Sequence, residues 1–359
     1  GQVTNLFRNE GVDGAVNSFA LINDTLFIGG SFRNQGNFRY GAAVYDTNSN
    51  QPDYSHAEPP ALNFGIQSKG FSNVDIAIPD EYGGWYVGGS FETYGDSNRY
   101  SLAHLDSMGQ VTDWNPMATS ATGNAVIKTM IKKGNTLFVA GSFESLGGKN
   151  RNSLAAIDLV TNQVTSWNPN PNNAVDHMQL LDSTLYIGGK FDSIGGLARN
   201  KFASVSTSTG FISPWSPLEN WNINFIYDLH TSQNKIILAG AFQNPMGGFM
   251  KVLAVDEING KLISWSYNTN YSIVRTLEGS GDTLFVGGNF NKINGATREG
   301  FAAFNISSGT LLPMTFPVQG GDVWELKKVN KTLYFRGIFN YSYSNERHAY
   351  AMDIPTVVL

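Results

Sequence analysis

The chain contains no cysteine, which excludes disulfide bonds, thiolate metal sites and cysteine nucleophiles. Charged residues are also scarce: they make up 15% of the 359 residues, against roughly 25% in an average globular protein. The formal net charge of −5 is mild for so long a chain. Because a protein that grips a phosphate backbone needs a basic surface, we expect no nucleic-acid partner.

Long apolar runs are absent as well. No stretch approaches the roughly 18 apolar residues of a membrane-spanning helix, and no charged-then-apolar segment at the amino end resembles a signal peptide. We therefore expect no membrane insertion. Residue 1 is Gly rather than Met, so we expect that the natural start has been removed, and a signal could have been removed with it.

Glycine and aromatic residues, by contrast, are plentiful and recur in one pattern. The segment T-L-Y-I-G-G-K-F at 184–191 has a relative in each part of the chain. Each copy ends at a phenylalanine that a glycine precedes by two residues: Phe32, Phe91, Phe143, Phe191, Phe242, Phe290 and Phe339. The gaps between these phenylalanines are 48 to 59 residues. Self-similarity at such a period marks a repeat protein, and we number its repeats 1 to 7 in chain order.

The third repeat shows the full unit most clearly. Its four short apolar segments lie at 127–131, 136–141, 153–158 and 163–168, and we label them strands A to D. They are rich in β-branched and aromatic residues and are bounded by turn residues, which is typical of strands. No window of helical length shows a 3.6-residue period. Four short antiparallel strands in about 50 residues are the content of one propeller blade.

The two ends of the chain complement each other. The last repeat stops after strand C at 349–353, and the chain begins with a lone strand D at 2–7. The sequence thus predicts an all-β fold: one seven-bladed β-propeller domain over 1–359, with four antiparallel strands per blade and a ring closed by pairing of the amino-terminal strand with the last blade. We expect the blades at approximately 14–63, 72–117, 125–169, 174–217, 225–267, 273–315 and 322–359 plus 2–7.

Several repeated polar residues look functional only until they are compared across repeats. Arginines recur in the loop after the phenylalanine: Arg39, Arg99, Arg151, Arg199, Arg298 and Arg347. They could grip a polyanion, but we favour bonds to local carbonyls. Aspartates recur at the end of strand C, where they favour turns: Asp46, Asp106, Asp158, Asp256 and Asp353. Tryptophans recur at the end of strand D and are expected to pack between blades rather than to stack on sugars: Trp114, Trp167, Trp215 and Trp265.

The pattern L-[FY]-[IV]-G-G-x-F, followed by G-G-x-x-R, L-A-A-x-D, T-[NG] and W-N-P, resembles the delta-60 type of β-propeller repeat of bacterial surface and secreted proteins. It is similar, more loosely, to kelch repeats. Repeat 1 lacks W-N-P, and repeat 7 lacks its own strand D. The resemblance implies an extracellular or cell-surface module for recognition or scaffolding, and it offers no catalytic residues to carry over.

A search for chemistry finds little. The five histidines have no metal-ligand spacing, and neither a G-x-S-x-G elbow nor an Asp-box pattern occurs. We therefore expect no catalytic residues, no metal site and no cofactor. His104 replaces a small residue of strand C, so we expect a histidine whose hydrogen bonds are satisfied in the core rather than a ligand.

The candidate site is found where repeats share a position but differ in residue type. One such position follows the first apolar residue of strand A, as Lys128 follows Ile127. In several repeats this position or the next one holds a charged or aromatic residue. Because strand A of a propeller lines the central channel, we predict a ligand site at one channel mouth, although solvated channel residues would explain the same pattern. The candidate ligand-binding residues are Asn17, Lys128, Asp176, His177, Tyr227, Asp228, Arg275, Trp324 and Glu325. Trp221 and Trp324 lie outside the tryptophan register and suit sugar stacking better than the repeated tryptophans do.

We therefore predict a non-catalytic binding or scaffold module of a secreted or surface-exposed bacterial or phage protein, with a glycan or a protein as its ligand. It could belong to a larger chain or surface assembly. Two alternatives stay open. One is a glycoside hydrolase or polysaccharide lyase that uses Asp176, His177, Asp228 and Glu325. Hydrolysis would require two carboxyl groups about 5 to 9.5 Å apart. The other alternative is a purely structural subunit.

Overall fold

The computed structural model describes residues 3–5, 15–22, 25–34, 39–46, 51–52, 73–94, 97–121, 123, 125–263, 273–315, 321–341 and 344–354. All regular elements in these ranges are strands, and none is a helix. No helix long and apolar enough to cross a membrane occurs in this described part. The chain forms two compact units. The N-terminal unit holds 7–178 and 208–210, and the C-terminal unit holds 1–6, 179–207 and 211–359.

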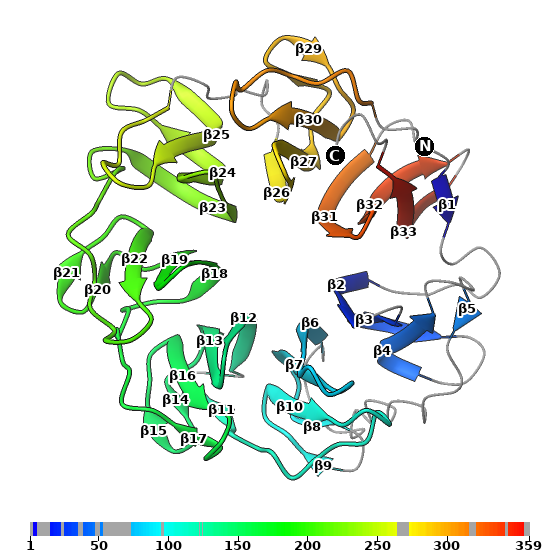
Figure 1. Ribbon diagram of the computed structural model, residues 1–359, viewed down its shortest axis with the longest axis vertical. Coiled ribbons are helices and arrows are strands. Elements are labelled where there is room, and N and C mark those ends of the chain that lie inside the picture. Colours follow the sequence, from blue (N-terminus) through cyan, green and yellow to red (C-terminus); the bar gives the residue numbers. More distant parts are fainter. Residues whose placement is uncertain are drawn as a thin grey trace. The chain divides into compact units, whose positions relative to one another are not determined.

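The main antiparallel sheets of repeats 1 to 3 lie in the N-terminal unit (Figure 1). Repeat 1 forms the sheet β2-β3-β4-β5, with β2 Ala15–Ile22, β3 Thr25–Asn34, β4 Arg39–Asp46 and β5 Gln51–Pro52. Repeat 2 forms β6-β7-β10, with β6 Asn73–Pro79, β7 Trp85–Ser90 and β10 Leu102–Leu105. Repeat 3 forms β12-β13-β16-β17, with β12 Val126–Lys133, β13 Thr136–Ser142, β16 Leu154–Asp158 and β17 Gln163–Val164. Repeat 4 begins with β18 Val175–Leu181.

The C-terminal unit continues the same construction. In repeat 4, β19 Thr184–Gly189 pairs with β22 Phe202–Ser206. Repeat 5 forms β23 Asn222–Ser232, β24 Lys235–Gln243 and β25 Phe249–Asp256, and repeat 6 forms β26 Ile273–Ser280, β27 Thr283–Asn289 and β30 Phe301–Asn305. Repeat 7 forms β31 Gly321–Val329, β32 Thr332–Tyr341 and β33 Ser344–Asp353.

Small hairpins lie between the second and third strands of several repeats. They are β8 Thr93–Tyr94 with β9 Ser97–Asn98, β14 Ser145–Leu146 with β15 Lys149–Asn150, β20 Ser193–Ile194 with β21 Leu197–Ala198, and β28 Lys292–Ile293 with β29 Ala296–Thr297. The short strand β11 Ala118–Thr119 pairs with β14. Repeat 5 is built differently here, because its long strands β24 and β25 occupy this place.

The amino-terminal strand β1 Val3–Asn5 pairs antiparallel with β33, as Figure 1 shows in the C-terminal unit. Val3 lies opposite Met352, and Asn5 lies opposite Tyr350. The sequence predicted this pairing, because the chain begins with a lone strand D and its last repeat has no strand D of its own. The closure of a ring and the number of blades stay predictions at this point.

The prediction for strand D was wrong in length. In repeat 3, only Gln163–Val164 forms a strand out of the expected 163–168. Two features explain why this strand ends early. The Trp167 N–H donates to the Thr165 hydroxyl at 3.2 Å instead of to a strand, and Pro169 has no N–H to donate. Elsewhere the fourth strand shrinks to a single bridge: Leu105 with Val111, Val205 with Ile212, Val255 with Leu262, and Phe304 with Leu311.

The repeated phenylalanines and glycines organise the core. Phe143, Phe191 and Phe242 are at most 3% exposed, and full burial of such a side chain contributes about 1.5–3 kcal/mol. Before each phenylalanine, the end of the second strand has two adjacent small positions, and repeats 1, 2, 4 and 6 have a glycine pair there. The first glycine of these pairs lets the next repeat approach. A Cβ on Gly88 would lie 2.7 Å from Ile127 Cγ2, and one on Gly287 would lie 2.6 Å from Val323 Cγ1. These glycines therefore permit close approach between neighbouring sheets.

The second of the two positions has a different role. It lies opposite the first strand of its own repeat, next to a β-bulge, as Gly141 lies opposite Ile127. A Cβ on Gly141 would collide with the backbone oxygen of Val126, and one on Gly288 would collide with that of Ile273. The bulge therefore requires glycine on the partner strand, which explains why this position is glycine in all seven repeats.

Candidate functional site

The loop arginines bind local carbonyls, as the sequence analysis favoured. Arg151 donates to the backbone oxygens of Asn150 at 2.7 Å and Thr165 at 2.6 Å. The same two bonds recur for Arg99, Arg199 and Arg298. Each arginine thus ties the loop after the second strand to the end of its own repeat. The side chains of Arg39 and Arg347 lie outside those described.

The repeated aspartates form turns, which confirms their structural interpretation. Asp158 accepts hydrogen bonds from the backbone N–H groups of Val160 at 2.9 Å and Thr161 at 2.8 Å. These bonds hold the pKa of its carboxyl below the ordinary value. Asp106 and Asp256 make matching turns, and the side chains of Asp46 and Asp353 lie outside those described. Trp114 and Trp167 are buried, and Trp265 lies outside the described residues.

The non-repeating positions of the first strands coincide with β-bulges. The register of β2 with β3 shifts across Asn17, that of β12 with β13 across Lys128, and that of β26 with β27 across Arg275. The same shift falls at Tyr227 and at Trp324. A bulge leaves its extra residue unpaired and turns its side chain away from the ladder. Variation in residue type is therefore tolerated here, while the neighbouring positions are held by the sheet.

Sequence comparison missed one member of this set. Asp75 is the residue across which the register of β6 with β7 shifts, so it occupies the bulge of repeat 2. Its signal was present, because N-V-D-I at 73–76 aligns with V-I-K-T at 126–129 once Val74 is matched with Ile127, the residue before the bulge. In the structure, Asp75 Oδ2 lies 3.0 Å from Lys128 Nζ. Two bulges in adjacent repeats thus form an ion pair.

His177 shares this part of the N-terminal unit. Burial lowers the pKa of His177 to about 4; the charge of Asp176 opposes this shift, and that of Lys128 adds to it. Lys128, Asp176 and His177 therefore lie close enough to interact electrostatically. Asn17 lies in β2, but its side chain is outside those described.

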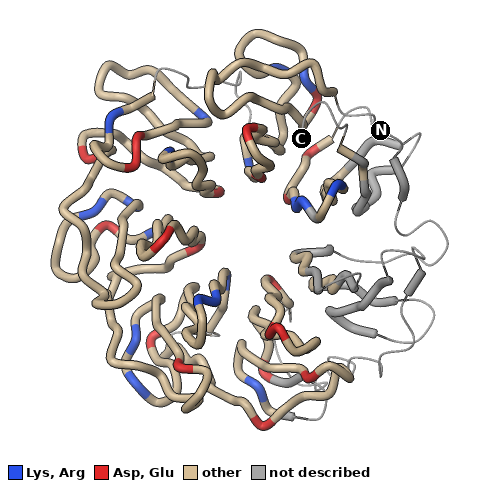
Figure 2. Tube along the Cα trace, viewed as in Figure 1, with Lys and Arg blue, Asp and Glu red and all other residues tan. Residues whose placement is uncertain are grey.

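In the C-terminal unit, the bulge residue Arg275 forms a two-pronged ion pair. Its Nε lies 2.7 Å from Asp322 Oδ1, and its Nη2 lies 2.9 Å from Asp322 Oδ2. Asp322 is the second residue of β31, so the pair joins repeats 6 and 7. Its side chain is 14% exposed, whereas that of Arg275 is 32% exposed. Charged residues of both signs lie along β26 and β31 in Figure 2.

Trp324 and Glu325 meet over one arginine. Arg336 Nε lies 2.7 Å from Glu325 Oε2, and the Arg336 guanidinium lies 5.8 Å from the centre of the Trp324 ring. The geometry suits a cation–π contact. Burial raises the pKa of Glu325, while the positive charge of Arg336 opposes the shift. The structure thus brings these two predicted residues together through Arg336, which the sequence analysis did not single out.

Asp228 bonds to the backbone of the next repeat. Its Oδ1 accepts from the N–H of Leu229 and its Oδ2 from that of Leu277, both at 2.8 Å. In the same manner, Thr276 accepts from Leu326 N at 3.2 Å and Glu278 from Lys328 N at 2.9 Å. Burial raises the pKa of Asp228 to about 7 against the effect of its backbone bonds. Its first role is therefore to join neighbouring first strands.

Tyr227 contributes an aromatic surface rather than a charge. Its ring stacks on that of Phe225, with centroids 5.9 Å apart and planes 23° apart. Phe225 is 54% exposed. Trp221, the other tryptophan outside the repeat register, instead packs against the core of repeats 4 and 5.

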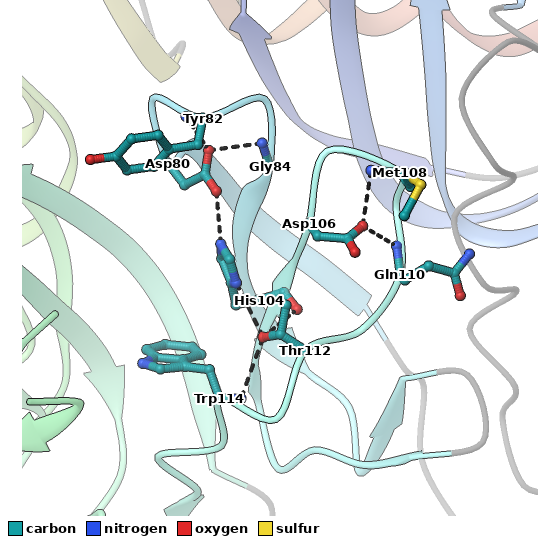
Figure 3. Close-up of polar contacts among 9 residues, drawn as sticks. All are labelled: Asp80, Tyr82, Gly84, His104, Asp106, Met108, Gln110, Thr112 and Trp114. Carbon is teal, nitrogen blue, oxygen red and sulfur yellow. Dashed lines mark hydrogen bonds and ion pairs between the residues drawn. The ribbon is translucent and has the colours of Figure 1, made fainter. Parts of the chain in front are cut away.

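A second polar cluster lies in repeat 2 (Figure 3). Asp80 Oδ2 lies 3.0 Å from His104 Nε2, and His104 Nδ1 lies 3.1 Å from the Thr112 hydroxyl. The order of carboxylate, imidazole and hydroxyl resembles a catalytic triad. However, Thr112 accepts from Trp114 N as Thr165 accepts from Trp167 N in repeat 3, so its hydroxyl is a repeated structural feature. The expectation that His104 is a satisfied core histidine is confirmed.

The acidic site residues are held by contacts within the fold. Within the described part of the chain, no group of three or more His, Asp or Glu side chains is placed to hold a metal ion. Asp228, Asp322 and Glu325 each accept hydrogen bonds from a backbone N–H or an arginine. These carboxylates are therefore engaged in joining elements of the fold.

Short antiparallel sheets that recur along the chain, each with a bulged first strand, define an all-β protein with the construction of a β-propeller. No protein-family model matches the chain, and no curated protein matches its sequence. Solved structures nevertheless have a similar backbone. The computationally designed protein Ika8 matches with a TM-score of 0.55 at 14% identity, covering 96% of this chain and 98% of that one.

Two natural proteins are also similar. The extracellular domain of the hybrid two component system BT4673 from B. thetaiotaomicron matches with a TM-score of 0.57 at 13% identity, covering 98% of this chain and 39% of that one. The Pan2 WD40 domain of Neurospora crassa matches with a TM-score of 0.54 at 12% identity, covering 96% and 90%. WD40 domains are β-propellers. At these identities the likeness shows the fold alone, and it supports a β-propeller.

Proposed function

We propose that the chain is a non-catalytic binding module that recognises a glycan or a protein. In this proposal it is a single seven-bladed propeller of the delta-60 type, closed by the pairing of β1 with β33. The ligand binds at the face where the first strands begin. The module belongs to a secreted or surface-exposed bacterial or phage protein and acts within a larger chain or surface assembly, without nucleic-acid partners or membrane insertion.

One observation carries this proposal: polar residues divide into two classes. Those that repeat, such as Arg151 and Asp158, make bonds to local backbone. Those that do not repeat lie at the bulges of the first strands, as Lys128 and Arg275 do. A surface whose residues vary while its backbone is fixed is suited to recognition. The extracellular domain of BT4673, a structural neighbour, supports the proposed location.

The test is binding to glycan and protein arrays by the protein and by Trp324→Ala and Asp176→Ala variants. We expect at least tenfold weaker binding in one or both variants. Tyr82→Ala serves as a control, because Tyr82 is 86% exposed in the turn between β6 and β7, away from the bulges. If a ligand binds and neither variant weakens it, the proposed face is wrong. Release of reducing ends or unsaturated sugars from polysaccharides would contradict the non-catalytic part.

A further inference from the structure

Between its second and third strands, repeat 5 departs from repeats 2, 3, 4 and 6 and resembles repeats 1 and 7, whose second and third strands are also long. Repeats 3, 4 and 6 have a separate two-residue hairpin there, tied down by Arg151, Arg199 and Arg298. Repeat 5 has Met250 and Lys251 where the arginine is expected. Its strands instead run on: β23 has 11 residues and β24 has 9, against 8 and 7 for β12 and β13 in repeat 3.

The extended end of this sheet is held in one conformation. Asn244 closes the turn between β24 and β25, because its side-chain oxygen accepts from Met246 N at 3.0 Å and from Gly248 N at 2.8 Å. Its backbone N–H also donates to the oxygen of Gly248 at 2.9 Å. A preformed surface loses little conformational freedom on binding.

The register gives the two faces of this extension opposite characters. Ile223 and Phe242 lie opposite each other and are at most 2% exposed, in contact with the core of repeats 4 and 5. Asn222, Gln243 and Phe249 form the adjacent row, and Phe225 lies opposite Ala241 in the row beyond. Because side chains alternate across a strand, Phe225, Gln243 and Phe249 share the other face.

That face presents two aromatic rings to solvent. Phe249 is 57% exposed and Phe225 is 54% exposed. They lie on the strands that flank β24 and two residues apart along it, so their backbones are about 12 Å apart by the usual strand spacing and rise. The Gln243 amide lies on β24, between the two strands that carry the rings, and Asn222 lies opposite it on β23. The Asn222 amide donates to Gln243 Oε1 and the Gln243 amide donates to the Gly247 oxygen, both at 3.4 Å, near the limit of a hydrogen bond. Both amides therefore keep capacity for a ligand. We call Asn222, Phe225, Gln243 and Phe249 the repeat-5 platform.

We propose that the repeat-5 platform binds a neutral oligosaccharide, an assignment that rests on the proposed binding function and specifies its ligand class. The apolar faces of two sugar rings stack on Phe225 and Phe249, and their hydroxyls bond to the amides between. Tyr227 supports Phe225 by stacking at 5.9 Å. The platform has no charged side chain, so it favours a neutral ligand over a uronic acid, a phosphate or a charged peptide.

The experiment measures binding of neutral gluco-, manno-, xylo- and galacto-oligosaccharides to the whole chain by calorimetry, with uronic-acid oligosaccharides as charged counterparts. The variants are Phe225→Ala, Phe249→Ala and, as matched control, Phe211→Ala, whose side chain is 77% exposed in the same unit but outside the platform. We expect at least tenfold weaker binding in the two platform variants, no change in Phe211→Ala, and little dependence on salt. Because all three rings are exposed, each variant should keep the wild-type melting temperature.

Two outcomes overturn the assignment, and they are distinguishable. If a neutral sugar binds and only Trp324→Ala or Asp176→Ala weakens it, the platform is wrong while the proposed function stands. If only charged sugars or peptides bind, the ligand class is wrong. If neither sugars nor proteins bind, the proposed function fails together with the platform.

Discussion

Gly141 and Lys128 lie on the two sides of one β-bulge, yet they differ completely across the repeats. The position of Gly141 is glycine in every repeat, because a Cβ would collide with the backbone oxygen of Val126. The position of Lys128 instead holds Asp75 in repeat 2 and Arg275 in repeat 6. The glycine makes the bulge, and the bulge frees its extra residue from the ladder. The repeated glycine and the variable residue therefore belong to the same β-bulge, one on each strand.

The variable positions also differ between the two units. The Arg275–Asp322 pair of the C-terminal unit has two bonds and an arginine that is 32% exposed, whereas the Lys128–Asp75 pair of the N-terminal unit has one contact and a lysine that is 43% exposed. The two carboxylates are buried alike, at 14% exposed for Asp322 and 12% for Asp75. A two-pronged, half-buried pair contributes more than an exposed one. We therefore expect stability to depend on the first pair, while the lysine of the second remains available to a ligand.

The largest effect should come from the repeated side of the bulge. Gly141→Ala places a Cβ against backbone atoms that cannot move without opening β12, so we expect a loss of about 3 kcal/mol or more in the free energy of unfolding. Ala140→Gly, one residue earlier, is the control and should cost about 1 kcal/mol. Urea denaturation checks both. Equal losses in the two variants would contradict the role assigned to the bulge.

Breaking the stronger ion pair should rank second. Arg275→Ala leaves the Asp322 carboxylate half-buried without its two bonds, and we expect a loss of about 2 kcal/mol. Arg275→Lys should recover only part of it, because an ammonium group cannot form the two-pronged contact. A double-mutant cycle with Asp322→Ala measures the coupling. A coupling near zero would show that the pair contributes no more than an exposed one.

The third effect depends on pH. The pKa of Asp228 is raised to about 7 from an ordinary 3.8 by burial. Between pH 3.8 and pH 7 the Asp228 carboxyl is protonated in the folded protein and ionised in the unfolded chain. The contribution of Asp228 to the free energy of unfolding is therefore full below pH 3.8 and is lost as pH rises through 7. Asp228→Asn removes this dependence. Relative to wild type, the variant should gain about 2.5 kcal/mol between pH 5 and pH 8, because the proton difference persists over about two pH units at about 1.4 kcal/mol each.

His230 acts in the opposite direction in the same unit. Burial lowers the pKa of His230 to about 4, and the charge of Lys327 adds to this. Its contribution to stability is therefore present above pH 6.5 and is lost as pH falls toward 4. His230→Gln serves as the control for the Asp228 measurement. If Asp228→Asn changes stability by the same amount at every pH, the raised pKa is contradicted.

The smallest effect on stability should come from Lys128→Ala. The ion pair with Asp75 has an exposed lysine, so we expect a change of about 0.5 kcal/mol. Thermal denaturation of this variant beside Arg275→Ala sharpens the comparison of the two units. A loss as large as that of Arg275→Ala would show that exposure does not separate the two pairs.

Local patterns were enough to predict the strands, their turns and the structural roles of repeated residues. Asp158 and Arg151 act as expected because each acts within its own repeat, through bonds to nearby backbone. The pairing of β1 with β33 was also predictable, because each end supplies what the other lacks. The length of strand D was not, since the Thr165 hydroxyl competes for the Trp167 N–H.

The sequence by itself determined a repeated all-β chain, the glycines that its bulges require, and the positions at which its repeats differ. It could not determine which variable residues meet, because contacts such as Arg275 with Asp322 and Trp324 with Arg336 depend on the packing of separate strands. Nor could it show that repeat 5 exposes Phe225 and Phe249 on one face. Sequence spacing sets each strand, whereas register and bulges decide where its side chains point.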